Sequence, residues 1–245
     1  ASARLGAGLA QRGRLGGGRA VARAHLHAAA RLAIAAARHG GVAARIGHGC
    51  VAIVQDVADA AGGAAFVAAA AEVLGGVDIV VANVSALAIA SDEEGWKRGF
   101  DTDLMGTVRF VNAAMPWLEK SANASIVTIS SVSGREIDFA SGPYGAIKAA
   151  IIHYTQGLAY HLAGKKIRAN TVSPGNTYFK GGVWEQIEHG NPELFKMALG
   201  LNPTGRMGTP QEMANAAVFL ASPAASFITG TNLVVDGALT KGVQF

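Results

Sequence analysis

Short apolar runs and longer helical patterns alternate along the chain. The short runs are rich in Val, Ile and Ala and stop at polar residues, as buried strands do. Runs of this kind predict strands over 32–36, 51–54, 78–83, 125–131, 168–173 and 232–236. The longer patterns repeat apolar residues at helical spacing. They predict helices over 59–74, 92–119, 144–162 and 210–221.

The predicted strands are apolar on both faces instead of alternating between apolar and polar residues. A parallel sheet with helices on each side requires strands of that kind. Strands that alternate with helices form right-handed βαβ units. With no internal repeat and no linker rich in Pro or Ser, residues 1–245 are predicted to form a single α/β domain. We expect a Rossmann-like, doubly wound parallel sheet.

Polar residues stand where several predicted strands end. Asp56, Asn83, Ser131 and the pair Pro174-Gly175 each follow an apolar run. The carboxyl ends of parallel strands meet at one edge of the sheet, where ligands bind in such folds. These residues are therefore expected to converge on one binding edge.

Tyr144 and Lys148 are four residues apart in a predicted helix, so they share one helical face. A phenol with a pKa of about 10 is a poor base at neutral pH. A nearby ammonium group favours the phenolate and lowers that pKa, which suits the phenol for proton exchange with an alcohol or alkoxide. Ser131, at the end of a strand, can donate to the same substrate oxygen. Taken alone, the Tyr–Lys spacing also fits a surface pair.

Together these motifs resemble the short-chain dehydrogenase/reductase family, over residues 51–237. The resemblance rests on a serine, Ser131, followed by Tyr144-Gly-Ala-Ile-Lys148 in the Tyr-x-x-x-Lys pattern. It implies that Tyr144 is the acid/base, that Ser131 orients the substrate oxygen, and that Lys148 binds the nicotinamide ribose and lowers the pKa of the tyrosine. It also implies a homotetramer or homodimer, with reduction of 3-oxoacyl thioesters as one common activity.

The same resemblance implies a set of cofactor contacts. Asp56-Val57 matches the pair that contacts adenine, and Asn83 matches the second asparagine of the Asn-Asn-Ala-Gly segment. Pro174 and Gly175 match the turn beside nicotinamide, and Thr177 is expected to contact the carboxamide. Val84 is bulkier than the family's alanine, which should affect cofactor affinity at most.

The N-terminal segment departs from the family pattern. The family opens with a strand and a Thr-Gly-x-x-x-Gly-x-Gly loop that holds the pyrophosphate. Gly16 and Gly18 resemble the end of this loop, but its first glycine would fall on Arg12 and no apolar strand precedes it. We infer that residues 1–50 are atypical and do not record the natural sequence, as a frame shift in a GC-rich gene would produce. The other interpretation is a divergent N-terminus, which peptide sequencing that matches the segment as written would support.

Asp103 is a second departure, because the family has an asparagine there that supports a water chain to the lysine. An aspartate brings negative charge towards Lys148 and opposes the lowering of the Tyr144 pKa. Asp103→Asn is therefore expected to raise the rate. The alternative for Asp103 is a helix carboxylate that faces solvent.

The cofactor is expected to be NADP(H) in preference to NAD(H). NAD-specific members carry an acid after the second strand, whereas Ala37-Arg38-His39 follows the run 32–36 here. Arg38 would suit a 2′-phosphate, although it could also be a solvated loop cation. Residues 179–201 occupy the position of the family's lid. Their apolar side chains favour a hydrophobic or medium-sized carbonyl substrate, or else packing against another subunit.

Charge and composition limit the other function classes. Residues 1–55 hold eight arginines and no acidic residue, while the rest of the chain holds 13 basic and 17 acidic residues. The arginines lack interleaved aromatic residues, so nucleic-acid binding is not expected. The histidines at 25, 27, 39 and 48 lack partners at metal-ligand spacing, so no metal is expected. No transmembrane run or secretory signal is evident, and a single cysteine fits the cytoplasm.

These observations predict an NAD(P)(H)-dependent oxidoreductase that moves a hydride between nicotinamide and a carbonyl or secondary alcohol. The alternative is a non-catalytic dinucleotide-binding sensor or scaffold, which the degenerate phosphate loop and Asp103 would fit. The Ser131, Tyr144 and Lys148 set argues for the enzyme, because a sensor has no need of an acid/base.

Overall fold

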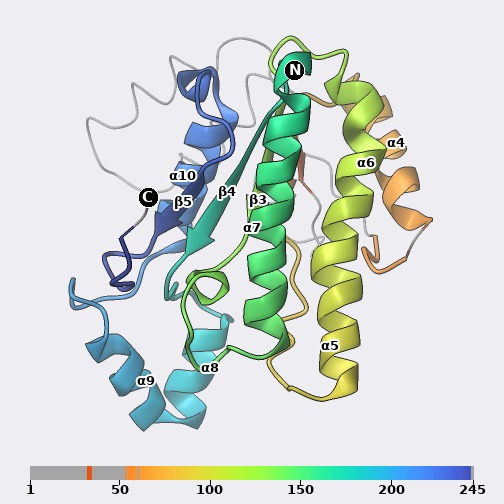
Figure 1. Cartoon of the computed structure of the whole chain (residues 1–245). Coiled ribbons are helices and arrows are strands. Elements are labelled where there is room, and N and C mark those ends of the chain that lie inside the picture. Colours follow the sequence, from red (N-terminus) through yellow and green to blue (C-terminus); the bar gives the residue numbers. More distant parts are fainter. Residues whose placement is uncertain (1–31, 35–52, 54, 60, 244–245) are drawn as a thin grey trace.

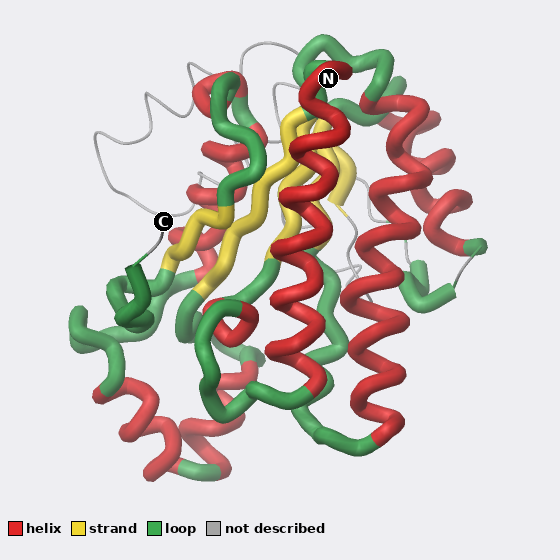
Figure 2. Tube along the Cα trace, in the orientation of Figure 1, coloured by secondary structure: helices red, strands yellow, loops and turns green. Residues whose placement is uncertain are grey.

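A parallel sheet forms the centre of the molecule, for which a computed structural model describes residues 32–34, 53, 55–59 and 61–243. The strand order across the described sheet follows the chain order, and every neighbouring pair is parallel. Figure 1 shows the strands as arrows and Figure 2 shows them in yellow. Their bounds are β1 Leu32–Ile34, β2 Ile79–Ala82, β3 Ser125–Ile129, β4 Arg168–Pro174 and β5 Asn232–Val235.

Helices connect the strands and cover both faces of the sheet (Figure 1). The connections between the first four strands hold α4 Gly62–Leu74, α5 Glu93–Gly99, the π-helix η2 Phe100–Met105, α6 Gly106–Leu118 and α7 Pro143–Leu162. The last connection holds α8 Val183–Gly190, α9 Pro192–Gly200 and α10 Pro210–Ala221. Short 3₁₀ turns add η3 Val132–Gly134, η4 Ala163–Lys165 and η5 Pro223–Ala225.

The strands bury apolar side chains on both faces, as the sequence predicts for a covered parallel sheet. Val80 and Ile126 face one way and pack in a core with α4, α6 and α7. Their neighbours Ile79 and Val127 face the other way and pack against Leu220 of α10. The described part of the sheet is therefore buried on both faces, and the residues that follow its strands at the carboxyl edge are the candidates for chemistry.

The long pattern over 92–119 is not one regular helix, which corrects the prediction. Asp92 caps the N-terminus by accepting a hydrogen bond from the Gly95 amide at 2.7 Å, and the acidic first turn fits the helix dipole. A π-helix then interrupts the α-helical pattern at Phe100–Met105. Hydrophobic periodicity could not reveal this segment, because the extra residue of a π-turn is accommodated by tertiary contacts.

Other boundaries agree closely with the predictions. The helix predicted over 210–221 is α10, whose capping box joins Thr209 to Glu212. The helix predicted over 144–162 begins one residue earlier, at Pro143, because proline is favoured in the first turn. The run 32–36 contains β1, whose Leu32 pairs with Ile79 of β2. The run 51–54 lies mostly outside the described residues.

Candidate active site

The candidate site lies at the carboxyl edge of β2, β3 and β4. β2 pairs with β3 and β3 with β4, so the residues that follow them emerge side by side. Asn83 follows β2, Ser131 follows β3, and Gly175 follows β4. The fold thus brings together three positions that are distant in sequence, as predicted.

Ser131 is fixed in a tight turn against α7. It precedes η3, and its Oγ accepts a hydrogen bond from the Ser133 amide at 3.2 Å. The preceding Ser130 Oγ donates to the Lys148 carbonyl at 2.8 Å. Gly134 permits the close approach, because a Cβ there would lie only 2.7 Å from the carbonyl carbon of Lys148. The turn therefore places the Ser131 hydroxyl relative to the first turns of α7.

Tyr144 and Lys148 lie one turn apart in α7. The Lys148 Nζ lies 5.5 Å from the centre of the Tyr144 ring, and the Ser131 hydroxyl is close enough to the Tyr144 phenol to act on its pKa. Tyr144 is half-buried, whereas Lys148 is buried at 3% exposure. The three side chains that the sequence singled out therefore share one location.

Asp103 joins this group from the π-helix. Its Oδ2 lies 3.2 Å from the Lys148 Nζ, and the two side chains are 3% and 4% exposed. The alternative of a solvent-facing carboxylate is therefore wrong. The Ser85 Oγ donates to Asp103 Oδ2 at 2.5 Å and the Ala86 amide donates to Oδ1 at 2.6 Å. The Lys148 Nζ also donates to the Ile129 carbonyl at 3.2 Å.

Ser85 is a residue that sequence reasoning missed. It stands where the Asn-Asn-Ala-Gly segment of the family has its glycine, a position that offers no side chain. The combination of a hydroxyl at 85 with a carboxylate at 103 is the signal that could have linked them.

The pKa of the Tyr144 phenol is raised, not lowered as expected. Burial is the largest cause, since it disfavours the phenolate; the Ser131 hydrogen bond acts in the opposite direction, and the charges of Asp103 and Asp138 raise the pKa further. Burial lowers the pKa of Lys148, while the Asp103 charge and hydrogen bond oppose this effect. Asp103 thus forms an ion pair with the Lys148 ammonium group, which was expected from the sequence to lower the pKa of the Tyr144 phenol.

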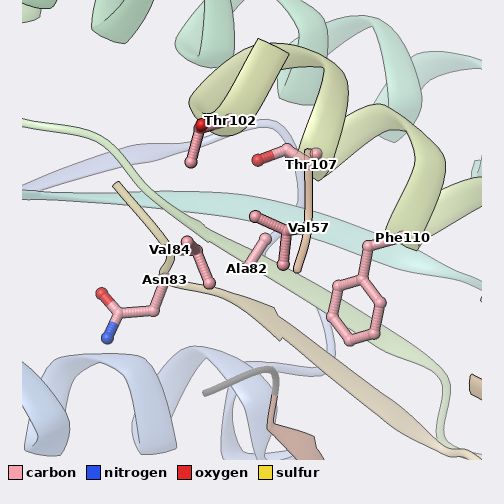
Figure 3. A pocket seen from close by; sticks show the side chains of 8 residues that line it. Val57, Ala82, Asn83, Val84, Thr102, Thr107 and Phe110 are labelled. Atoms are coloured by element: carbon pink, nitrogen blue, oxygen red, sulfur yellow. The ribbon is translucent and has the colours of Figure 1, made fainter. Parts of the chain in front are cut away.

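An apolar cleft lies beside the end of β2. Its empty volume is ≈ 220 Å³, including open solvent. Figure 3 shows Val57, Ala82 and Val84 in its lining, with the Asn83 amide directed away from them. Asp56 is exposed, and its Oδ1 accepts a hydrogen bond from the Ala58 amide at 3.0 Å. The hollow is small, and it lies beside the residues that are predicted to contact adenine.

The turn after β4 holds the remaining predicted contacts. Pro174, Gly175 and Thr177 are each partly exposed, and the Thr177 Oγ1 donates to the Gly175 carbonyl at 3.0 Å. A Cβ at Gly175 would lie 2.6 Å from the Cβ of Asp236, so this turn requires glycine. The predicted contacts Gly16, Gly18 and Arg38 lie outside the described residues.

The segment predicted as a lid, 179–201, contains α8 and α9. Trp184 and Ala198, both 5% exposed, pack with Met207 in a small core of their own. Partly buried neighbours complete that core: Tyr178, Val183, Ile187, Phe195 and Leu199. Many apolar side chains of the lid therefore pack against one another. Their presence is weaker evidence for a hydrophobic substrate than the sequence alone indicated.

Two comparisons of sequence place the chain among known proteins. The family model described as Enoyl-(Acyl carrier protein) reductase matches residues 13–240. Isoepoxydon dehydrogenase of Penicillium expansum is 46% identical over 182 residues, which are 74% of this chain and 70% of that protein. The 3-oxoacyl-[acyl-carrier-protein] reductase of Thermotoga maritima is 34% identical over 169 residues, 67% of each chain.

The structure has matching neighbours as well. An NADPH-bound short-chain oxidoreductase from Pseudomonas aeruginosa, described as containing an atypical catalytic center, superimposes with a TM-score of 0.76. It is 26% identical in sequence, and the match covers 84% of this chain and 86% of that one. The fold and the relatives thus define an NAD(P)-dependent oxidoreductase. The chain belongs to the short-chain dehydrogenase/reductase family.

Proposed function

We propose that Tyr144 is the acid/base for transfer of a hydride between nicotinamide and a carbonyl or secondary alcohol carbon. The observation that carries this proposal is the position of the Tyr144 ring, whose centre lies 5.5 Å from the Lys148 Nζ, with the Ser131 hydroxyl near enough to act on the pKa of the phenol. In this arrangement Tyr144 can donate a proton to the substrate oxygen. Ser131 can orient the same oxygen, and Lys148 supplies a positive charge nearby.

The residues at the sheet edge fit a nicotinamide dinucleotide. An ammonium group has three N–H bonds; Lys148 directs two of them at Asp103 and the Ile129 carbonyl, so the third can donate to a ribose hydroxyl. Val57, Asn83 and Thr177 lie among the residues that we propose contact the cofactor, and Val57 and Asn83 line the small hollow beside β2. When bound, the cofactor supplies or accepts the hydride.

The protein's own residues then handle the substrate oxygen. In the reductive direction, Ser131 turns its hydroxyl to the carbonyl oxygen and orients it, and Tyr144 gives its proton to that oxygen as the carbon is reduced. In the oxidative direction, Tyr144 takes the proton from the alcohol. Lys148 holds positive charge near the phenol, and Asp103 is a positioning residue that holds Lys148.

NADPH is the proposed cofactor. Arg38 would favour a 2′-phosphate at the end of the second strand of the family fold. The NADPH-bound state of the Pseudomonas aeruginosa neighbour supports the same preference. An Arg38→Ala variant should lose affinity for NADPH more than for NADH.

The remaining proposals concern cellular context. We propose a homotetramer or homodimer that works in the cytoplasm on a small carbonyl or alcohol, without nucleic acid or membrane partners. Among the described residues, no helix is long and apolar enough to cross a membrane. Ultracentrifugation of the full chain tests the assembly.

Loss of NADPH or NADH absorbance with ketones, diketones and 3-oxoacyl esters tests the proposed chemistry. Tyr144→Phe should lower kcat by roughly 10²–10⁴-fold, the contribution of a positioned proton donor. Tyr160→Phe is the matched control, because Tyr160 lies in the same helix and is 83% exposed. Tight nucleotide binding by wild-type protein without turnover of any substrate would refute the catalytic assignment.

A further inference from the structure

Two serine hydroxyls and a carboxylate form a row that begins at the carboxyl end of β3. The Ser131 Oγ donates to the Ser133 Oγ at 3.2 Å, and the Ser133 Oγ donates to the Asp138 Oδ2 at 2.6 Å. Ser131 is buried, whereas Ser133 and Asp138 are half-buried. The row therefore leads outwards from the hydroxyl that we propose orients the substrate oxygen.

The row lies against the first turn of α7, which carries Tyr144. A Cβ added at Gly145 would lie 2.8 Å from the Ser133 carbonyl oxygen and 3.1 Å from the Ala140 carbonyl oxygen. Because Gly145 follows Tyr144 directly, these contacts hold Ser133 beside the proposed acid/base. Burial is the largest cause of the raised pKa of the Tyr144 phenol, and the Asp138 charge is among the causes that raise it further.

The hydroxyl proton of Ser133 is directed away from Ser131. A carboxylate only accepts hydrogen bonds, so the single proton of the Ser133 hydroxyl points at the Asp138 Oδ2. The Asp138 Oδ1 accepts from the Ala140 amide at 2.8 Å, which holds the carboxylate in place. Towards Ser131, the Ser133 oxygen can therefore act only as an acceptor, and the Ser131 hydroxyl fills that acceptor position.

Substrate binding removes the donor from this acceptor. In the proposed reaction Ser131 turns its hydroxyl to the substrate carbonyl oxygen, so its hydrogen bond to Ser133 is lost. An acceptor that is left without a donor weakens binding unless another donor replaces the first. The two serine oxygens are 3.2 Å apart, which is comparable to the spacing of a carbonyl oxygen and a hydroxyl oxygen on the neighbouring carbon. A substrate hydroxyl on that carbon can therefore supply the missing hydrogen bond.

The charges near the row favour a neutral donor over an ionised one. Asp138 repels a substrate carboxylate, and Lys148, whose Nζ lies 5.5 Å from the centre of the Tyr144 ring, repels a substrate ammonium group. Asp103 does not compete for a second substrate oxygen, because it is paired with Lys148 at 3.2 Å and its side chain is 3% exposed. A hydroxyl group is the neutral donor that fits.

We propose that Ser133 is a specificity-determining residue that selects ketones with a hydroxyl group on the carbon next to the carbonyl, and the vicinal diols formed from them. Asp138 is the positioning residue that keeps Ser133 an acceptor. The inference rests on the proposed function, because it takes Ser131 as the group that orients the substrate oxygen. The second substrate oxygen keeps its proton and both of its bonds throughout, so the reaction itself is the one proposed above.

A pair of ketones separates hydrogen-bond donation from the electronic effect of a second oxygen. Hydroxyacetone and methoxyacetone both carry an oxygen on the carbon next to the carbonyl, but only hydroxyacetone can donate a hydrogen bond. Initial rates of NADPH oxidation give kcat/KM for each ketone with wild type and Ser133→Ala. Wild type should prefer hydroxyacetone by about tenfold, the effect of one hydrogen bond to an otherwise unpaired acceptor. The preference should disappear in Ser133→Ala, which has no oxygen at this position.

Ser141→Ala is the matched control and should keep the wild-type preference, because Ser141 is exposed in the same loop and takes no part in the row. A Ser133→Ala variant that lowers both kcat/KM values by the same factor would show a structural role and overturn the proposal. A wild-type enzyme that reduces the two ketones equally well, or that reduces other ketones but not hydroxyacetone, would overturn it too. Reduction that survives Tyr144→Phe would instead refute the underlying acid/base assignment.

A second variant reverses the Ser133 hydrogen bond while the hydroxyl stays in place. Asp138→Asn keeps an oxygen for the Ala140 amide but presents an NH₂ group to Ser133, which frees the Ser133 proton to point towards the substrate. The kcat/KM for methoxyacetone should rise, because its ether oxygen only accepts, and the preference for hydroxyacetone should fall. Glu136→Gln is the control for charge, since Glu136 lies in the same loop and accepts instead from the Gly242 amide at 3.0 Å. A wild-type preference in Asp138→Asn would contradict the inferred direction and overturn the proposal.

Discussion

Replacement of Asp103 by asparagine removes the negative partner of a buried ion pair. Asp103 and Lys148 lie 3.2 Å apart with side chains 3% and 4% exposed. Loss of one partner from such a pair costs about 3–5 kcal/mol, because the remaining charge stays buried. The introduced amide can still accept from the Ala86 amide, and Lys148 keeps the Ile129 carbonyl, so we expect the lower end, about 3 kcal/mol. For a chain of this size that corresponds to a fall in Tm of about 6–12 °C.

Urea unfolding followed by tryptophan fluorescence measures this loss in Asp103→Asn, Lys148→Met and the double variant. The double variant removes both charges, so its free energy of unfolding should exceed the additive expectation by about 2 kcal/mol. If the loss of stability in the double variant equals the sum of the two single losses within about 0.5 kcal/mol, the two side chains are not coupled. An Asp103→Asn protein as stable as wild type would refute the energetic reasoning outright.

The same variant has a kinetic consequence. The Asp103 charge raises the pKa of Tyr144, so its removal should lower that pKa and shift the pH dependence of alcohol oxidation to lower pH. At a fixed pH below the wild-type midpoint, more of Tyr144 is then in the phenolate form and oxidation is faster. A slower Asp103→Asn enzyme at every pH would contradict this interpretation of Asp103.

Three further predictions concern packing, acid stability and cofactor choice. Gly134→Ala should lower the free energy of unfolding by about 1–3 kcal/mol and lower activity by displacing Ser131, because its Cβ would lie 2.7 Å from the backbone of α7. The control is Gly157→Ala, whose Cβ would meet open space. This variant should instead stabilise α7 by about 0.5–1 kcal/mol. The Arg206 hydrogen bond and the Thr209 amide hold the pKa of Glu212 at about 2, below its ordinary 4.5. Glu212 therefore stabilises the fold above pH 4.5 and loses this effect as the pH falls towards 2, so Glu212→Gln should lower Tm at pH 7 and match wild type at pH 2. Arg38→Ala should raise the KM for NADPH several-fold more than the KM for NADH, as measured from initial rates. Equal changes in the two KM values would mean that Arg38 does not contact the 2′-phosphate.

The sequence predicted those features that depend on local spacing. Tyr144 and Lys148 share a face because they are one helical turn apart, and Ser131 ends a strand whose neighbours are parallel. The family relationship and the oxidoreductase class predicted from these residues are confirmed. The roles of the individual side chains stay predictions.

The features that escaped prediction depend on contacts between distant segments. Ser85 meets Asp103 only because the end of β2 lies beside the π-helix. The raised pKa of Tyr144 follows mainly from burial, which spacing along one helix does not report. Val183 and Phe195 pack within the lid, whereas their apolar character alone was equally consistent with a substrate or another subunit.

The π-helix at Phe100–Met105 constrains how this segment can vary in length. A π-turn contains one residue more than an α-turn, so the faces of α5 and α6 are offset around a common axis. This offset lets Gly99 pack near Ile147, whose Cγ1 would lie 3.6 Å from a Cβ added at Gly99, while Gly106 packs against Val57. Deletion of a single residue from Phe100–Met105 would restore regular winding and rotate Asp103 out of reach of Lys148, even with every apolar position of α6 retained.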